Sequence, residues 1–319
     1  MFVKLGTFGV KLQTVSWVME TVGLGVDAGA SSSRWLLLSS RGRVLGEGRA
    51  GFLTGHIFGA EARDEQLGRF LDLLNAAKAV RAPDALVAGV TGLHPGTEAA
   101  ALFARAVAEV LGLGLKRTVL HNDMHVAFAS AFSPGEGVLV YAGTGSVAYH
   151  ESETGETVRA GGHGYLIDDA GAGYWIGHEG LRALFRLVDA AGKAPETPLA
   201  EALYARLGSR DWPEIMPVVY GGGRSFVASL APAVGAAERA GDALAKDILE
   251  RAGAELARLA RDVLGRLGAP LPVAFAGGVT HLPVVTGALG AHLGAPVRVV
   301  QDEPVQAAAR LALRLATGP

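Results

Sequence analysis

Two short turns, Gly25-Val26-Asp27-Ala28-Gly29-Ala30-Ser31 and Ala142-Gly143-Thr144-Gly145-Ser146, decide how the fold of this chain is interpreted. Each turn follows an apolar, strand-sized run and leads into a second such run, so each is expected to join two β-strands. Small and hydroxyl-bearing residues allow backbone N–H groups to approach an anion closely. Neither turn has the P-loop pattern and neither opens a helix, which disfavours a P-loop nucleotidase and a dinucleotide-dependent dehydrogenase. An ordinary hairpin turn remains an alternative for the first turn taken alone.

The periodicity around the first turn predicts three strands, a helix, a strand, a helix and a strand. The expected ranges are 22–28, 34–40, 43–49, 62–80, 85–90, 97–111 and 118–121. A short helix is expected to begin near Met124.

The same order recurs around the second turn. The expected ranges there are 137–142, 147–151, 157–160, 174–190, 271–275, 282–293 and 297–300, followed by a helix over 305–315. Between them, a long amphipathic helix over 234–267 is expected to break near Gly241.

This repetition indicates two α/β domains built on one plan, with a helical insert over about residues 191–268 in the second domain. A chain of 319 residues is also close to the upper limit for a single core. We expect residues 1–122, together with the C-terminal helix 305–319, to form the first domain, and residues 123–304 to form the second. The binding site is then expected in the cleft between the domains, beyond the carboxyl ends of the strands.

Composition narrows the function classes. The chain has 45 glycines, no cysteine, and 29 basic against 31 acidic residues for a net charge of -2. The absence of cysteine excludes disulfides, thiolate zinc sites and cysteine-ligated iron–sulfur clusters. The sequence has no basic block of the kind that would predict a nucleic-acid partner. No run reaches the roughly 18 apolar residues of a membrane span. A small ligand is the expected partner.

The first twenty residues do not match a secretory signal, because Lys4, Lys11 and Gln13 interrupt their apolar stretch. They are either an extra strand or upstream sequence ahead of a functional chain that begins near Met19. Both interpretations stay open.

Two aspartates follow strands of the first half. Asp27 lies at the end of the first strand, where a carboxylate can hold a hydrated cation. Asp123 follows the strand over 118–121, ahead of a helix. Asp123 either caps that helix or acts as a general base at the mouth of the cleft.

Glycines and carboxylates also precede helices of the second half. Gly162, His163, Asp168 and Asp169 could line a polar pocket, or could simply begin a helix whose dipole favours acidic residues. Gly277-Gly278 ends a strand, and its backbone could approach a nucleotide. The nine histidines are scattered and predict no transition-metal site.

Taken together, these residues resemble the BadF/BadG-type ATPases of the actin-like sugar-kinase superfamily, in the branch of N-acetylglucosamine kinases. The resemblance covers nearly the whole chain from Gly23 onward. Its motifs are the two turns, Asn122-Asp123, Gly162-His163-Gly164, Asp169-Ala170-Gly171-Ala172-Gly173-Tyr174-Trp175-Ile176-Gly177, Gly241-Asp242 and Gly277-Gly278-Val279.

The resemblance implies two actin-like, ribonuclease H-like α/β domains and ATP-dependent phosphorylation of an amino sugar at its 6-hydroxyl, with Mg²⁺. It implies that Asp123 is the base and that Asp27 positions the metal through water. It assigns phosphate or nucleotide contacts to Gly29, Ala30, Ser31, Gly143, Thr144, Gly145, Ser146, Gly277 and Gly278. It assigns sugar contacts to His56, Asn122, Gly162, His163 and Asp169. A cytoplasmic homodimer is also implied.

The chain departs from the family pattern mainly in the expected sugar pocket. Thr54-Gly55-His56 stands where an Asn often precedes the His, and His163 replaces an aromatic residue. A carboxylate is lost at Ala170 and one is gained at Asp168, while Ser31 replaces a Thr in the first turn. These changes leave the identity of the sugar open.

Three alternatives to an N-acetylglucosamine kinase follow from the family or from the fold. A glucosamine kinase or a broad-specificity hexokinase of the same family would use the same machinery. The family's activators of 2-hydroxyacyl-CoA dehydratases hold an iron–sulfur cluster with cysteines, and this chain has none. From another class, the alternative is an actin-like regulator that binds nucleotide or sugar without catalysis, or a polymerising actin-like protein.

Overall fold

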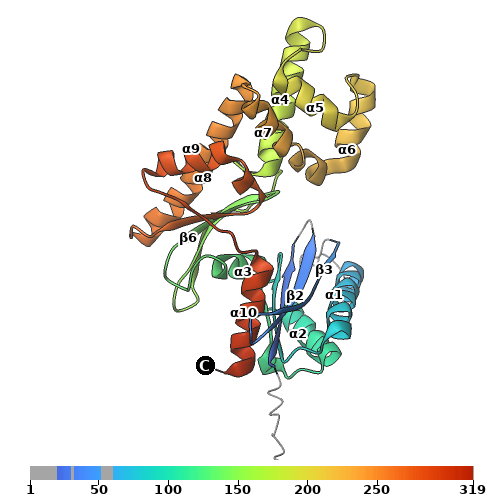
Figure 1. Cartoon of the computed structure of the whole chain (residues 1–319), viewed down its shortest axis with the longest axis vertical. Coiled ribbons are helices and arrows are strands. Elements are labelled where there is room, and N and C mark those ends of the chain that lie inside the picture. The colour runs from blue at the N-terminus through green and yellow to red at the C-terminus, as the bar shows by residue number, and fades with distance from the viewer. Residues whose placement is uncertain (1–19, 30–31, 52–59, 319) are drawn as a thin grey trace, which may run out of the picture.

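Two five-stranded mixed sheets form the framework of the protein. The computed structural model describes residues 20–29, 32–51 and 60–318, with side chains of the first helix from residue 64 onward. The strand orders are β3-β2-β1-β4-β5 in the first sheet and β10-β9-β6-β7-β8 in the second. Figure 1 shows one sheet above the other, with helix α3 at their junction.

The first sheet contains β1 (Val22–Ala28), β2 (Ser33–Ser39), β3 (Val44–Ala50), β4 (Ala85–Val90) and β5 (Thr118–His121). The strands β1, β4 and β5 are parallel, whereas β2 and β3 are antiparallel to their neighbours. Helices α1 (Ala60–Val80) and α2 (Glu98–Leu111) follow β3 and β4, and the short helix η1 (Leu115–Arg117) precedes β5. One face packs on α1 and α2 through Phe70, Leu74 and Phe103.

The opposite face of the first sheet is covered by α10 (Pro304–Thr317), the C-terminal helix. Glycines in β1 let this helix approach closely. A Cβ added at Gly25 would lie 2.3 Å from the backbone nitrogen of Ala309 and 2.5 Å from the carbonyl oxygen of Val305. The chain therefore returns at its end to pack on its first strand.

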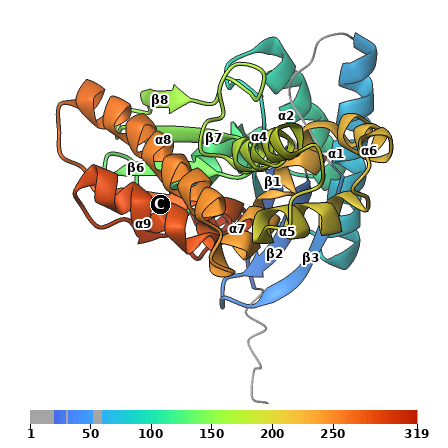
Figure 2. The same ribbon diagram turned by 90° about the horizontal axis from the view of Figure 1, so that it is seen from above.

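The second sheet contains β6 (Val138–Ala142), β7 (Ser146–Glu151), β8 (Thr157–Gly161), β9 (Val273–Ala276) and β10 (Arg298–Val299). Its order matches that of the first sheet strand by strand. Helix α3 (Asp123–Ala129) packs on one face through Ala127 and Phe128. Helices α8 (Ala243–Leu267) and α9 (Pro283–Leu293) lie on the other face (Figure 2).

Helix α8 falls within the range predicted as the insert, but it packs on the second sheet through Leu256, Leu259 and Ala260. The predicted helix over 174–190 is α4 (Gly173–Ala191), and its helix neighbours are α5, α6, α7 and α8. Therefore α8, rather than α4, covers the second sheet. Sequence periodicity identifies both helices, but cannot show which of them lies on the strands.

The remaining helices are α5 (Pro198–Leu207), α6 (Trp212–Ala228) and α7 (Ala231–Arg239). Figure 1 shows them with α4 at the end of the upper part, away from the first sheet. The predicted break near Gly241 is confirmed between α7 and α8. A second break, at Gly223 inside α6, was not predicted: its φ of 55° and ψ of -148° are not helical.

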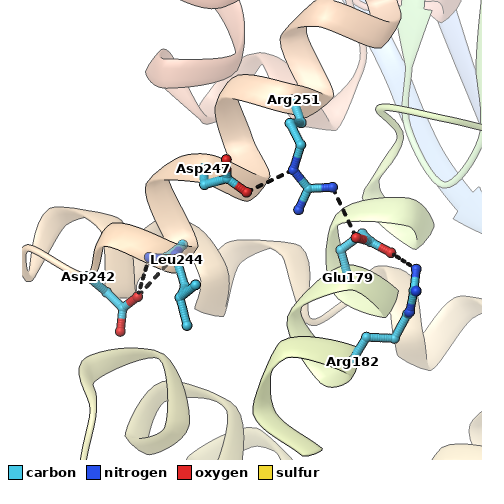
Figure 3. A network of polar contacts seen from close by, with 7 residues as sticks. Glu179, Arg182, Asp242, Leu244, Asp247 and Arg251 are labelled. Atoms are coloured by element: carbon cyan, nitrogen blue, oxygen red, sulfur yellow. Dashed lines mark hydrogen bonds and ion pairs between the residues drawn. The ribbon is translucent and has the colours of Figure 1, made fainter. Parts of the chain in front are cut away.

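Asp242 joins two of these helices. As the N-cap of α8, its Oδ1 accepts hydrogen bonds from the N–H groups of Leu244 and Ala245, each at 3.0 Å. Its Oδ2 accepts from the N–H of Leu199 in α5 at 2.9 Å. Figure 3 shows this cap beside a network in which Glu179 of α4 accepts from Arg251 of α8.

The fold class is confirmed: the protein has two α/β units with a common strand order. The expected strand over 297–300 is shorter, at Arg298–Val299. The interpretations of the first nineteen residues lie outside the described residues. Among the residues that the structure describes, no helix is long and apolar enough to span a bilayer.

Candidate functional site

The N-terminus of α3 brings Asp123 to the carboxyl ends of the parallel strands. Asn122 is the N-cap of α3, because its Oδ1 accepts a hydrogen bond from the N–H of Met124 at 3.0 Å. Its Nδ2 donates to the carbonyl oxygen of Leu93 at 3.4 Å. The amide of Asn122 therefore has an internal partner at each end and caps α3, and its sugar contact stays a prediction.

Asp123 and Asp27 come together because a glycine lies between them in the sheet. Asp27 of β1 pairs with Gly89 of β4, and Gly89 pairs with His121 of β5. A Cβ at Gly89 would lie 2.3 Å from Cγ2 of Val126 and 3.1 Å from Cα of Asp123. Only a residue without a side chain lets α3 begin over β4 at this distance.

Thr91, which directly follows β4, holds the carboxylate of Asp123. Its hydroxyl donates to Oδ2 of Asp123 at 2.7 Å, and the N–H of Met124 donates to Oδ1 at 3.1 Å. These two hydrogen bonds orient the carboxylate of Asp123 at the edge of the sheet.

The two carboxylates share a poorly solvated environment. The pKa of Asp27 is raised to about 7, mainly by burial and then by the negative charge of Asp123, whereas Arg34 opposes the shift. Arg34 is the register partner of Asp27 on β2 and forms an ion pair with Glu303 at the start of α10. Two carboxylates that destabilise each other's charge are favourable surroundings for a divalent cation.

Tyr141 of β6 brings the second sheet to the same place. Burial raises the pKa of its hydroxyl, and the charges of Asp27 and Asp123 raise it further. The electrostatic influence of both aspartates on a residue of the second sheet indicates that the two halves meet here. In the described part of the chain, no group of three or more His, Asp or Glu side chains is arranged to hold a metal ion.

The second turn closes on the segment that leads into α4. The carbonyl oxygen of Gly143 accepts from the N–H of Gly173 at 2.8 Å, and that of Thr144 accepts from the N–H of Tyr174 at 3.2 Å. Ser146 is buried, and its hydroxyl donates to the carbonyl oxygen of Ala170 at 2.8 Å. Ser146 is therefore held inside the protein by this bond, and its phosphate contact stays a prediction.

The predicted nucleotide glycines lie next to this turn. Gly277 has a φ of 96°, and a Cβ added there would lie 2.4 Å from the carbonyl oxygen of Ala142, the last residue of β6. A Cβ at Gly278, the first residue of η2 (Gly278–His281), would meet nothing within 4 Å. The structure thus brings the second turn and Gly277-Gly278 together.

The expected sugar segment also returns to the second turn. The N–H of Gly162 donates to the carbonyl oxygen of Ser146 at 2.9 Å, while His163 is exposed. Asp169 is 2 % exposed and has a φ of 60°, a strained backbone conformation for a residue with a side chain. Its Oδ1 accepts from the N–H of Ser146 at 3.2 Å.

Asp169 has a cationic partner that sequence reasoning missed. The Nη2 of Arg224 donates to Oδ2 of Asp169 at 3.1 Å. Burial raises the pKa of Asp169, against the hydrogen bond from Ser146 and the charge of Arg224. The run Gly221-Gly222-Gly223 before Arg224 was the available sequence signal, because such a run often interrupts a helix.

The other missed residues are Arg34, Thr91, Tyr141 and Glu303. Thr91 directly follows a strand of the parallel set, so its position at the carboxyl edge could have been found from the sequence. The predicted contacts at Ala30, Ser31 and His56 lie outside the described residues.

Comparison with known proteins identifies relatives of this chain. The model of the BadF/BadG/BcrA/BcrD ATPase family matches residues 24–309. The chain belongs to this family. The predicted resemblance is thereby confirmed.

Two curated members are similar over part of their length. An N-acetylmuramic acid/N-acetylglucosamine kinase of Clostridium acetobutylicum is 30% identical over 170 residues, which cover 52% of this chain and 55% of that protein. An N-acetyl-D-glucosamine kinase of Dictyostelium discoideum is 30% identical over 182 residues, 54% of this chain and 56% of the relative. The matched region spans about half the length of these curated relatives.

Two solved structures share the whole fold. A candidate N-acetylglucosamine kinase from Chromobacterium violaceum has a TM-score of 0.70 and 26% identity, covering 93% of this chain and 99% of that one. A structure of the same description from Porphyromonas gingivalis has a TM-score of 0.72 at 19% identity, covering 92% and 98% of the two chains. The second comparison supports the fold alone.

Proposed function

We propose that this protein is an ATP-dependent sugar kinase that phosphorylates N-acetylglucosamine or a related amino sugar. The observation that carries the proposal is the Asp123 carboxylate, oriented by Thr91 at the carboxyl edge of the parallel strands and adjacent to Asp27. The names of the curated relatives and of the Chromobacterium violaceum structure support the substrate class.

In the proposed reaction, Asp123 accepts the proton of the sugar 6-hydroxyl as its oxygen attacks the terminal phosphorus of ATP. A bond forms between that oxygen and phosphorus, and the bond to the bridging oxygen breaks, so ADP leaves with the electron pair. A positioned carboxylate base and an aligned acceptor are the main contributions that a protein makes to this transfer.

The residues fit a magnesium ion held through water near Asp27. The mutual repulsion of Asp27 and Asp123 favours a cation, and carboxylate oxygens are ligands that Mg²⁺ prefers. When bound, the ion would neutralise charge on the phosphates.

The proposed contacts are those that the family resemblance implies. Phosphate or nucleotide contacts are assigned to Gly29, Ala30, Ser31, Gly143, Thr144, Gly145, Ser146, Gly277 and Gly278. Sugar contacts are assigned to His56, Asn122, Gly162, His163 and Asp169. We propose that residues 1–122 with 305–319 and residues 123–304 form two domains whose closure excludes water. A cytoplasmic homodimer completes the proposal, on the strength of the family resemblance.

The test is a coupled assay of ADP release with ATP and Mg²⁺ against N-acetylglucosamine, N-acetylmuramic acid, glucosamine, N-acetylmannosamine and glucose. We expect turnover to depend on an amino sugar, and phosphorus NMR of the product to show a 6-phosphate. The same preparation without sugar is the control for idle ATP hydrolysis. ATP-dependent assembly without sugar-dependent ADP release would instead support a polymerising actin-like protein.

A further inference from the structure

Arg224 reaches the second turn from the helical segment because α6 is broken immediately before it. The non-helical dihedral angles of Gly223 redirect the chain, so Arg224 begins the last part of α6 in a new direction. A Cβ added at Gly145 would lie 2.7 Å from Nη2 of Arg224 and 2.7 Å from each carboxylate oxygen of Asp169. The guanidinium and the carboxylate thus lie together against the backbone of the turn.

The guanidinium of Arg224 is incompletely satisfied. Its Nη2 binds Asp169, but its Nε is buried and has no hydrogen-bond partner in the described part of the chain. The guanidinium also lies 5.5 Å from the ring centroid of Tyr165, and the side chain as a whole is 32% exposed. Buried donors without partners are unfavourable, and an anion with several oxygens would satisfy them in pairs.

The position of Arg224 indicates which anion this is. Its Nη2 lies against Gly145 of the turn proposed to hold phosphates and donates to Asp169 of the proposed sugar pocket. In a phosphoryl transfer, the terminal phosphate is the nucleotide group that must adjoin both the phosphate-binding turn and the acceptor sugar. Inner phosphates and the base do not meet this requirement.

We propose that Arg224 binds the terminal phosphate of the nucleotide, the group that is transferred to the sugar. This inference rests on the proposed kinase function. Arg224 donates hydrogen bonds and keeps its protons throughout, while the proton of the sugar hydroxyl goes to Asp123. Its charge stabilises the phosphoryl group as negative charge develops on the oxygens.

The experiment compares the binding of two nucleotides that differ in the terminal phosphate. Calorimetry measures the dissociation constants of Mg²⁺ADP and of the non-hydrolysable ATP analogue AMPPNP for the wild type, Arg224→Gln and Arg224→Lys, without sugar. Arg224→Gln is expected to weaken AMPPNP binding by about tenfold or more while leaving ADP binding within about twofold. Arg224→Lys, which keeps the charge, is expected to recover part of the loss.

Arg210→Gln is the matched control. Arg210 also donates to a carboxylate, that of Glu201, but Glu201 lies on α5 and not in the proposed site. It is expected to bind both nucleotides as the wild type does. The proposal is overturned if Arg224→Gln changes AMPPNP and ADP binding equally, or if Arg210→Gln reproduces its effect. Should Arg224→Gln fail to fold, the AMPPNP to ADP ratio of Arg224→Lys decides: an unchanged ratio overturns the proposal.

These outcomes separate the inference from the kinase proposal. AMPPNP binding requires no turnover, so Arg224 can fail this test while sugar-dependent ADP release by the wild type still supports a kinase. If the wild type binds neither nucleotide, both proposals are overturned.

Discussion

The two halves of the molecule share a strand order, yet their equivalent turns face different chemistry. In the first half, the carboxylates of Asp27 and Asp123 repel each other near the end of β1. In the second half, Asp169 lies beside the turn after β6 and is paired with Arg224. Asp123 comes from α3 and Arg224 from α6, both outside the repeated strands. The comparison teaches that the repeated sheet positions the turns, whereas the connecting helices supply their charged partners.

The largest expected effect is on kcat, and it distinguishes the proposed base Asp123 from the proposed sugar contact Asp169. Asp123→Asn removes the proposed base but keeps its shape, and should lower kcat by about 10²–10⁴-fold with little change in ATP affinity. Asp169→Asn should act mainly by raising KM for the sugar. Steady-state ADP release measures both constants, and near-normal kcat for Asp123→Asn would contradict its assignment as the base.

The next effect concerns how closely a helix covers each central strand. On one face, β1 presents Gly23 and Gly25 to α10, whereas β6 presents Leu139 and Tyr141 toward α3. Gly25→Ala places a Cβ against the helix backbone and should cost about 3 kcal/mol of unfolding free energy.

Gly265→Ala is the control for that substitution, because Gly265 is helical and a Cβ there meets nothing within 4 Å. It should leave the protein as stable or stabilise it by about 0.5–1 kcal/mol. Urea unfolding measures both variants. Equal stability of the two would show that α10 does not require the glycine.

A smaller effect is expected where the helical segment joins the second half. Asp242→Ala removes the cap of α8 and the partner of the Leu199 N–H, and should cost about 1–3 kcal/mol. Asp247→Ala, in the same helix, breaks only an exposed ion pair with Arg251 and should cost less than about 1 kcal/mol. Figure 3 shows both aspartates. Thermal unfolding should rank them in this order; a reversed order would contradict the role of the cap.

The smallest expected effect is a dependence of stability on pH, caused by His121 at the end of β5 in the first half. The pKa of His121 is lowered from 6.5 to about 4, mainly by burial and then by the neighbouring His125, whose ring is stacked on it with the ring centroids 3.9 Å apart. The unfolded chain therefore binds this proton more readily, so stability should fall as the pH drops from about 6.5 toward 4. Burial raises the pKa of Glu151, but the hydrogen bond from His125 and the other contacts outweigh burial. The pKa of that carboxyl is therefore lowered.

The variant His121→Gln should lose less stability than the wild type between pH 7 and pH 5, measured by urea midpoints. The equivalent strand of the second half ends at Val299, which does not titrate. An equal loss in variant and wild type would assign the pH dependence to other groups.

Much of the fold could be predicted because its signals are local. The strand Ala85–Val90 and the helix Glu98–Leu111, with Thr97 as its cap, lie where apolar period and capping chemistry indicate. The role of α8 could not be predicted in this way, because α4 and α8 are both amphipathic helices. Which one lies on the sheet depends on contacts between residues far apart in the chain.

The residues of the candidate site also fall into those that local sequence signals indicate and those that depend on long-range packing. Asp27 and Asp123 could be proposed from the sequence because Asp27 lies at the end of one strand and Asp123 comes two residues after another, and the carboxyl ends of parallel strands meet at one edge. The sequence by itself therefore determined the two α/β units, the turns and these two carboxylates.

Only the tertiary structure decided which polar groups have partners. It assigned the cap to Asn122, buried the hydroxyl of Ser146, and brought Arg224 to Asp169 through the kink at Gly223. The physical reason is that local propensity acts over a few residues, whereas a charged side chain finds its partner through the packing of whole helices. Arg224 and Asp169 are separated by 55 positions along the chain and are in hydrogen-bond contact in space.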